Sequence, residues 1–331
     1  PLLESHPAWF DLERDKCFDI CLAAYLLDPD QRSSSWERIL EAYLPQAGVH
    51  RDNQGLAALE IGRLLEKRLE SAGLLELMHN LEKPLSPILV RMQQRGVKID
   101  LEAFRSFLQD VSSELESLTE SIYQMAGERF NLRSSQQVAR VLFQEMGIKP
   151  GRKTPSGIPS TASEVLEGLQ VQHPVIPKLL RHRSLEKLRS TYLEPLPRLV
   201  DSEHRLHSRF NQMSTATGRL SSSNPNLQNI PIKGEFGSRM RSCFVAPRGR
   251  CLVAADYSQI ELRILAHFSR DPTLLEAFTG GQDIHAKTAG LILDRDAGEI
   301  SPEQRRQAKT INFGLIYGMG PQKLARETGI T

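Results

Sequence analysis

Apolar residues recur at helical spacing through roughly the first 200 residues of the chain. The run Phe18–Leu27 is almost entirely apolar and stops at Asp28-Pro29-Asp30. Leucines at helical spacing predict a longer helix over Ala57–Leu81, and an amphipathic repeat predicts another over Leu101–Met125 that ends at Gly127. This part of the chain is therefore expected to be helical.

Short polar patterns mark further helix starts. Ser134-x-x-Gln137 and Thr161-x-x-Glu164 have the form of capping boxes, in which side chains satisfy the first N–H groups of a helix. Between them, Lys149–Pro159 is rich in proline and glycine and predicts a loop.

From about residue 205 shorter apolar runs predict strands over Arg205–Phe210, Met240–Ala246 and Arg250–Ala255. The last is expected to be a buried strand that places Asp256 at its C-terminal end, before a helix over Tyr257–Phe268. A carboxylate at such a position is a common metal ligand. The alternative is that Asp256 only caps the helix.

A further helix is predicted to begin at Ser301-Pro302 and to run to Tyr317. Arg305, Lys309, Phe313 and Tyr317 recur every four residues, so they lie on one stripe about 120° wide. The cations can hold phosphate oxygens, and the rings can carry a sugar and a base. The alternative is an amphipathic helix with exposed charges at one end and buried aromatics at the other.

The segment Thr215–Pro231 is rich in amides and hydroxyls and is charged only at Arg219. Such groups bind phosphates and base edges in the minor groove, although an ordinary surface loop is the alternative. Around it, residues 204–250 hold eight Lys or Arg against one acid, Glu235, although the whole chain carries a net charge of only +2. This local excess suits a polyanion.

Composition excludes several classes of protein. The four cysteines form no Cys-x-x-Cys pair, so neither a zinc site nor a disulfide framework is expected. A protein of this kind is expected in a reducing compartment. No 18-residue apolar run and no signal peptide occur, so no membrane segment is expected. The chain begins with Pro1 rather than Met and is interpreted as a processed or partial piece.

The order of three segments resembles the family A DNA polymerases, the bacterial DNA polymerase I group. Asp256–Arg263 resembles that family's first catalytic motif, Arg305–Gly318 its fingers-helix motif, and Thr217–Pro231 its primer–template motif; Gln282–His285 lies between the first two. The resemblance runs from about Glu82 to the end.

The resemblance implies an α+β, predominantly α fold that forms part of a polymerase right hand. Residues 1–83 would be a vestigial 3′-5′ exonuclease-like segment, 84–204 the thumb, 205–270 the start of the palm with the first catalytic motif, and 271–331 part of the fingers. The early Asp-x-Glu motif of the exonuclease is missing, and Leu56-x-x-x-Glu60 stands where Tyr-x-x-x-Asp is expected, so proofreading is not expected.

A site for a deoxynucleoside triphosphate and two Mg²⁺ ions is also implied by the resemblance. Asp256 would bind both ions, helped by the backbone carbonyl of Tyr257. Arg305, Lys309 and His285 would hold the triphosphate, with Asp256 and the two cations as the catalytic set.

The resemblance also assigns residues to the sugar and the base. Phe313 would pack on the deoxyribose, and Tyr317 would stack near the templating base. Glu261 would exclude a ribose 2′-hydroxyl, and Gln259 would support the same site.

The expected partners are primer–template DNA and dNTPs, with no membrane, for a monomer in the bacterial cytoplasm at the nucleoid. The residues expected to contact DNA are Arg219, Asn226, Gln228 and Asn229 in the minor groove, Lys149, Arg152 and Lys153 at the thumb tip, and Lys233. The family commonly has Arg at the position of Lys233; the charge is kept, but the bidentate fork is not.

One departure from the family concerns activity. The second metal carboxylate of the family lies in a His-Asp-Glu sequence, and no His-Asp dipeptide occurs in these 331 residues. The expected function is therefore DNA-directed DNA polymerisation by two-metal phosphoryl transfer, with this chain alone inactive. The alternative is a non-catalytic DNA-binding protein with a degenerate polymerase fold. A nuclease would need clustered acids, and a single-subunit RNA polymerase fits Glu261 and Phe313 less well.

Overall fold

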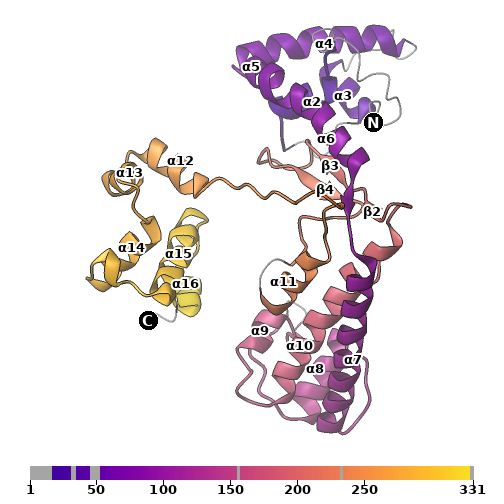
Figure 1. Ribbon diagram of the computed structural model, residues 1–331, viewed down its shortest axis with the longest axis vertical. Helices are drawn as coiled ribbons and strands as arrows, with labels where there is room; N and C mark the ends of the chain where they lie inside the picture. The colour runs from indigo at the N-terminus through magenta and orange to yellow at the C-terminus, as the bar shows by residue number, and fades with distance from the viewer. Residues whose placement is uncertain (1–16, 31–34, 45–52, 155–156, 232–233, 329–331) are drawn as a thin grey trace. The chain divides into compact units, whose positions relative to one another are not determined.

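The computed structural model describes residues 17–30, 35–44, 53–154, 157–231 and 234–328. The chain divides into two compact units, Pro1–Leu252 and Val253–Thr331. Each unit is described by itself, and Figure 1 labels their elements.

The described part of the first unit begins with the helices α2 (Ile20–Leu27), α3 (Trp36–Tyr43) and α4 (Gln54–Ser71). The predicted helix over 57–81 is interrupted, because Gly73 takes a left-handed φ of 69°. The N–H of Leu74 donates to the carbonyl of Leu69 at 2.8 Å, as in a Schellman motif. The chain then continues as α5 (Leu75–Leu77), the π-helical turn η3 (Met78–Glu82) and α6 (Lys83–Arg95).

A long helix, α7, organises the next part of the first unit. Asp100 caps it by accepting the N–H groups of Glu102 and Ala103, both at 3.0 Å, and it ends at Gly127 as expected. α7 packs along α10 in Figure 1. The elements here are α7 (Leu101–Ala126), α8 (Ser135–Ala139), η4 (Arg140–Glu145), α9 (Ser163–Glu167), α10 (Val175–Leu188), η5 (Arg189–Leu193) and η6 (Leu196–Arg198).

The two predicted capping boxes differ in outcome. Ser134 caps α8 by accepting the N–H of Gln137 at 3.4 Å, but the Gln137 side chain accepts from Asn131 instead of closing the box. Thr161 caps nothing: α9 begins two residues later with Ala162 at its N-cap. The Thr161 hydroxyl and carbonyl both accept from Arg183, so they are engaged by another helix.

Among the described residues of the first unit, two short antiparallel strand pairs form the sheet structure. β1 (Val97–Lys98) pairs with β2 (Arg205–Leu206), and β3 (Arg209–Asn211) pairs with β4 (Ser221–Ser223). The predicted strand over 205–210 is thus split between two partners. The predicted strand over 240–246 is wrong at its start, because Gly234–Ser242 is a helix, α11. Its Phe236 and Met240 pack into the core at helical spacing.

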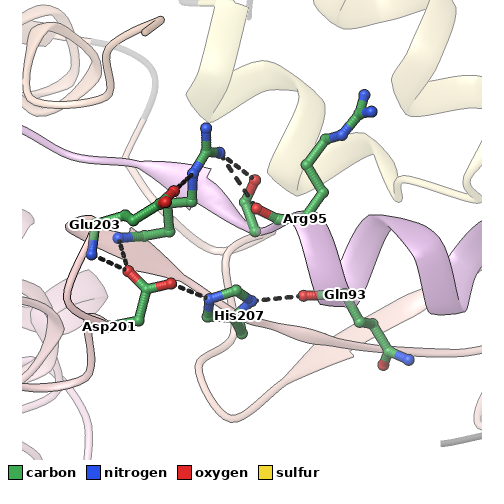
Figure 2. A network of polar contacts seen from close by, with 7 residues as sticks. Gln93, Arg95, Asp201, Glu203 and His207 are labelled. Carbon is green, nitrogen blue, oxygen red and sulfur yellow. Dashed lines mark hydrogen bonds and ion pairs between the residues drawn. The ribbon is translucent and has the colours of Figure 1, made fainter.

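His207, which follows β2, ties this strand to the end of α6 (Figure 2). Its ring nitrogens lie 2.7 Å from the carbonyl oxygen of Gln93 and 2.9 Å from a carboxylate oxygen of Asp201. Because both partners can accept, they favour the imidazolium, and the pKa of His207 is raised mainly by the Asp201 hydrogen bond. The bonds from His207, Arg205 and Glu203 lower the pKa of Asp201 to about 2.

The second unit is built from helices: α12 (Ile260–Ser269), α13 (Pro272–Thr279), α14 (Ile284–Leu293), η7 (Ala297–Glu299), α15 (Pro302–Ile316) and α16 (Pro321–Thr328). Leu262, Ala277 and Ile284 form its core, and Phe313 packs against them. None of the described helices is both long and apolar enough to cross a membrane.

The predicted buried strand over 250–255 is wrong in this structure. Residues 251–256 have no regular structure and are exposed, with Val253 85% exposed. A strand needs a hydrogen-bonding neighbour, and no described residue pairs with this stretch. The next helix begins at Ile260, three residues later than predicted, after Gln259 in a left-handed conformation.

Candidate nucleotide-binding site

The start of α15 is fixed by its own sequence. The hydroxyl of Ser301 accepts the N–H of Gln304 at 3.2 Å, and the Gln304 side chain accepts the N–H of Ser301 at 2.9 Å. Pro302 occupies the first turn, where its missing N–H has no partner to lose. The predicted helix is confirmed, and a complete capping box fixes its start.

The stripe on α15 is a continuous row of side chains. The ammonium of Lys309 lies 6.0 Å from the ring centroid of Phe313, and the rings of Phe313 and Tyr317 are stacked at 6.5 Å and 15°. Lys309 is exposed, and Tyr317 is 64% exposed. Phe313 is half-buried against the core of the unit. The alternative prediction, an amphipathic helix with buried aromatic residues at one end, therefore holds for Phe313 but not for Tyr317.

Arg305 is held in place by Asp283, the N-cap of α14. One carboxylate oxygen of Asp283 accepts the N–H groups of His285 and Ala286 at 2.9 and 3.2 Å, and the other accepts Nε of Arg305 at 2.6 Å. Burial works to raise the pKa of Asp283, but these hydrogen bonds outweigh it and the pKa is lowered. Sequence reasoning gave Asp283 no role, although an Asp before an apolar helix is a signal for a cap.

His285 lies beside the stripe and is almost completely buried, at 2% exposure. Its ring centroid is 5.8 Å from that of Phe313. Burial lowers the pKa of His285, and the charges of Arg305 and Lys309 lower it further against the opposing effect of Asp283. Burial and the two neighbouring cations therefore favour the neutral ring.

Glu261, in the first turn of α12, contacts the far end of the stripe. The hydroxyl of Tyr317 donates a hydrogen bond to its carboxylate. The structure thus brings Glu261, His285 and the four stripe residues together within one unit. Gln259 lies at the N-cap of α12 and forms no side-chain cap there.

Asp256 does not cap a helix, so that alternative is wrong. It lies in the exposed stretch before α12, next to Tyr257, which is 79% exposed. Among the described residues no group of three His, Cys, Asp or Glu side chains could hold a metal ion. One carboxylate and a backbone carbonyl do not fit two Mg²⁺ ions, since each ion needs about six oxygen ligands in near-octahedral order.

The predicted DNA-contacting segment lies in the first unit, in and after the β3–β4 hairpin. Its apolar residues Leu227 and Ile230 pack on the core, while Arg219, Asn226, Gln228 and Asn229 are exposed. Two of the amide side chains also brace the loop itself. Oδ1 of Asn226 accepts the N–H of Gln228 at 3.0 Å, and the Gln228 amide donates to the carbonyl of Leu220 at 2.9 Å.

The predicted thumb-tip cations lie on the loop between η4 and α9. Lys149, Arg152 and Lys153 are all exposed, and Lys153 forms an isolated bridge with Pro159. Lys233 lies outside the described residues.

Sequence reasoning missed a cavity of about 760 Å³ near this loop. Its lining includes Arg133, Arg183 and Lys187 together with several hydroxyls. Arg133 lies in the turn before α8, whereas Arg183 and Lys187 lie on α10, so the tertiary fold brings them together.

Comparison with known proteins places this chain in a family. Residues 101–331 match the sequence profile of DNA polymerase family A. The chain is 45% identical over 318 residues to the thermostable DNA polymerase I of Thermus filiformis, covering 96% of this chain and 38% of that protein. It is 39% identical over 338 residues to DNA polymerase I of Bacillus subtilis, covering 95% and 38%.

Among solved structures, the polymerase domain of Pol1 from M. smegmatis, in complex with primer–template DNA and dNTP, superposes with a TM-score of 0.85 at 36% identity. The match covers 95% of this chain and 56% of that one. The chain therefore belongs to DNA polymerase family A, as predicted. It spans 38% of the length of the two relatives named above.

Proposed function

We propose that this chain carries the nucleotide-binding and primer–template-binding parts of a DNA-directed DNA polymerase, which adds dNTPs to a primer 3′-hydroxyl under the direction of a template. The observation that carries the proposal is the row of two cations and two rings on α15 with a buried histidine beside it. The names of the relatives support it, as does the DNA and dNTP complex of the M. smegmatis protein.

The cationic end of α15 would hold the triphosphate. Arg305 is pre-oriented by Asp283, and Lys309 extends into solvent one turn further along. Charged hydrogen bonds to phosphate are stronger than neutral ones, and the helix N-terminus adds its partial positive charge. Binding of this kind positions the reacting phosphate and neutralises charge, which are the main terms in phosphoryl transfer.

The aromatic end of the stripe would receive the sugar and the base. Phe313 packs against the core of the unit and so would offer a fixed platform for the deoxyribose. Glu261, held by Tyr317, would occupy the space that a ribose 2′-hydroxyl needs. Gln259 would support this region.

The first unit would bind the primer–template duplex by its shape rather than its sequence. The exposed side chains of Arg219, Asn226, Gln228 and Asn229 suit the minor groove, and Lys149, Arg152, Lys153 and Lys233 suit phosphates. We also propose the division into exonuclease-like remnant, thumb, palm and fingers at residues 83, 204 and 270, for a monomer that works at the bacterial nucleoid.

The 331 residues present are proposed not to extend a primer, because the one carboxylate expected to bind metal, Asp256, does not fit two Mg²⁺ ions. The test is incubation of the purified chain with a labelled primer–template, Mg²⁺ and dNTPs. Duplex and dNTP binding without extension is the expected result. Extension would contradict the inactivity, and failure to bind dNTP would contradict the proposed site.

The second candidate, a non-catalytic DNA-binding protein, is favoured by that same single carboxylate. This candidate predicts that the affinity for the duplex does not change when a dNTP is added. The polymerase proposal predicts instead that a dNTP complementary to the template base tightens the complex with a primer–template more than a mismatched dNTP does.

A further inference from the structure

We propose that Asn312 is a positioning residue that holds His285 in its Nε2–H tautomer, so that the ring presents a hydrogen-bond donor to a triphosphate. The inference rests on the proposed function, in which a triphosphate lies at the cationic end of α15. It concerns a residue on the inner side of the same helix, beside Phe313.

The donors and acceptors around Asn312 can be assigned by starting from a backbone carbonyl, which can only accept. The carbonyl of Ile284 can only accept, and the hydroxyl of Thr288 lies 2.8 Å from it. That hydroxyl is also 3.1 Å from Oδ1 of Asn312, but its single proton serves the shorter contact. Its lone pair then accepts from Nδ2 of Asn312 at 3.0 Å.

The same amide nitrogen faces the histidine. Nδ2 of Asn312 lies 3.0 Å from Nδ1 of His285, so the second N–H of the amide is directed at the ring. A ring nitrogen that accepts cannot carry a proton. A neutral imidazole has one N–H, which must therefore be on Nε2.

The groups around the ring favour this state. Arg305 and Lys309 face it from α15 and disfavour a second proton, as burial does. Among the described residues Asp283 supplies the opposing charge, and both of its oxygens are engaged with backbone N–H groups and Arg305 rather than with Nδ1. Phosphate oxygens accept hydrogen bonds, so a ring that presented an Nε2 lone pair would repel them.

The test is a ¹⁵N NMR spectrum of the 331-residue chain with ¹⁵N-labelled histidine. The signals of His285 are assigned by their loss in the His285→Gln variant. The proposal expects an unprotonated Nδ1 and a protonated Nε2 at neutral pH. An Nδ1–H tautomer in the unaltered chain would overturn it without any variant.

Variants then test the role of Asn312. Asn312→Asp replaces the donor by an acceptor of the same shape, so Nδ1 should become protonated and the pKa of His285 should rise by about 1 to 3. Thr288→Val removes a hydroxyl that contacts both ends of the amide, at 3.0 Å from Nδ2 and 3.1 Å from Oδ1; this should loosen the amide and increase the Nδ1–H fraction. Thr310→Val is the matched control, because its hydroxyl bonds the Arg306 carbonyl of its own helix.

If Asn312→Asp does not fold, Thr288→Val decides the same question. Unchanged His285 signals in every folded variant would overturn the proposal. Titration with a dNTP separates this inference from the proposed function. An Nε2–H tautomer that depends on Asn312, with signals that do not move on adding dNTP, would leave the positioning role intact and contradict the triphosphate site.

Discussion

The hydroxyl of Tyr317 donates a hydrogen bond to the carboxylate of Glu261, which joins the end of α15 to the first turn of α12. The two residues are 56 positions apart in the chain. If Glu261 is the group that excludes a ribose 2′-hydroxyl, its selectivity depends on how firmly this bond holds it.

Tyr317→Phe tests that dependence. The variant keeps the ring and its stacking on Phe313 but leaves the carboxylate of Glu261 without this donor. A hydrogen bond of this kind is worth about 1 kcal/mol, so the preference for dNTP over rNTP should fall about fivefold. Competitive binding of the two nucleotides to the chain measures it, with Tyr43→Phe as the control. A preference that stays the same would show that Glu261 needs no help from Tyr317.

Lys309 and Arg306 form a matched pair of cations on α15. Lys309 lies on the stripe, whereas Arg306 is bonded to Glu303 on a different face, at 2.6 Å. Lys309→Gln should weaken dNTP binding about tenfold and reduce its salt dependence, since a charged contact to phosphate is lost. Arg306→Gln should have little effect. Equal losses in both variants, measured by fluorescent-dNTP titration, would mean that only the net charge of the unit matters.

The His207–Asp201 pair makes stability depend on pH in a defined direction. The raised pKa of His207 stabilises the fold fully below its unfolded value of about 6.5, and this contribution is lost as pH rises through the folded value. The lowered pKa of Asp201 contributes above about 3.9 and is lost as pH falls toward about 2. The pair therefore contributes most between about pH 4 and 6.5.

His207→Gln should remove the alkaline part of this dependence. Urea unfolding of the unaltered chain should show a decline in stability above about pH 6.5 that is smaller in the variant. His79→Gln, at an exposed position on η3, is the control. An identical decline in the unaltered chain and in His207→Gln would assign the pH dependence to other groups.

Gly96 permits the close approach of His207 to α6. It has a φ of 61°, and an added Cβ would lie 2.7 Å from the Leu206 carbonyl oxygen and 2.9 Å from the His207 ring. Gly96→Ala should cost about 1–2 kcal/mol for the left-handed conformation and more for the clash. Gly73 has a φ of 69°, and an added Cβ there would meet nothing within 4 Å. Gly73→Ala should therefore cost only the free energy of the left-handed conformation. Equal losses in chemical denaturation would mean that the ring and strand move aside freely.

Local signals predicted the helices well where the caps and the repeat agreed. α7 has an Asp cap and a regular apolar face, and α15 has a full capping box, so both lie within a residue or two of the predicted bounds at each end. Thr161-x-x-Glu164 has the same form but fails, because Arg183 binds the threonine. Sequence spacing cannot show that competing partner.

The candidate site was predictable in part for the same reason. Spacing of four placed the stripe on one face of α15, but the contacts of Asp283 with Arg305 and of Asn312 with His285 arise from the packing of α14 on α15. The strand expected before Asp256 failed because strand formation depends on neighbours that apolarity alone does not specify.

Residues 251–255, Cys-Leu-Val-Ala-Ala, leave apolar side chains and unpaired backbone groups open to solvent. An uncharged stretch of this kind can pair with copies of itself in concentrated protein. We therefore expect this short stretch to promote self-association of the chain at high concentration.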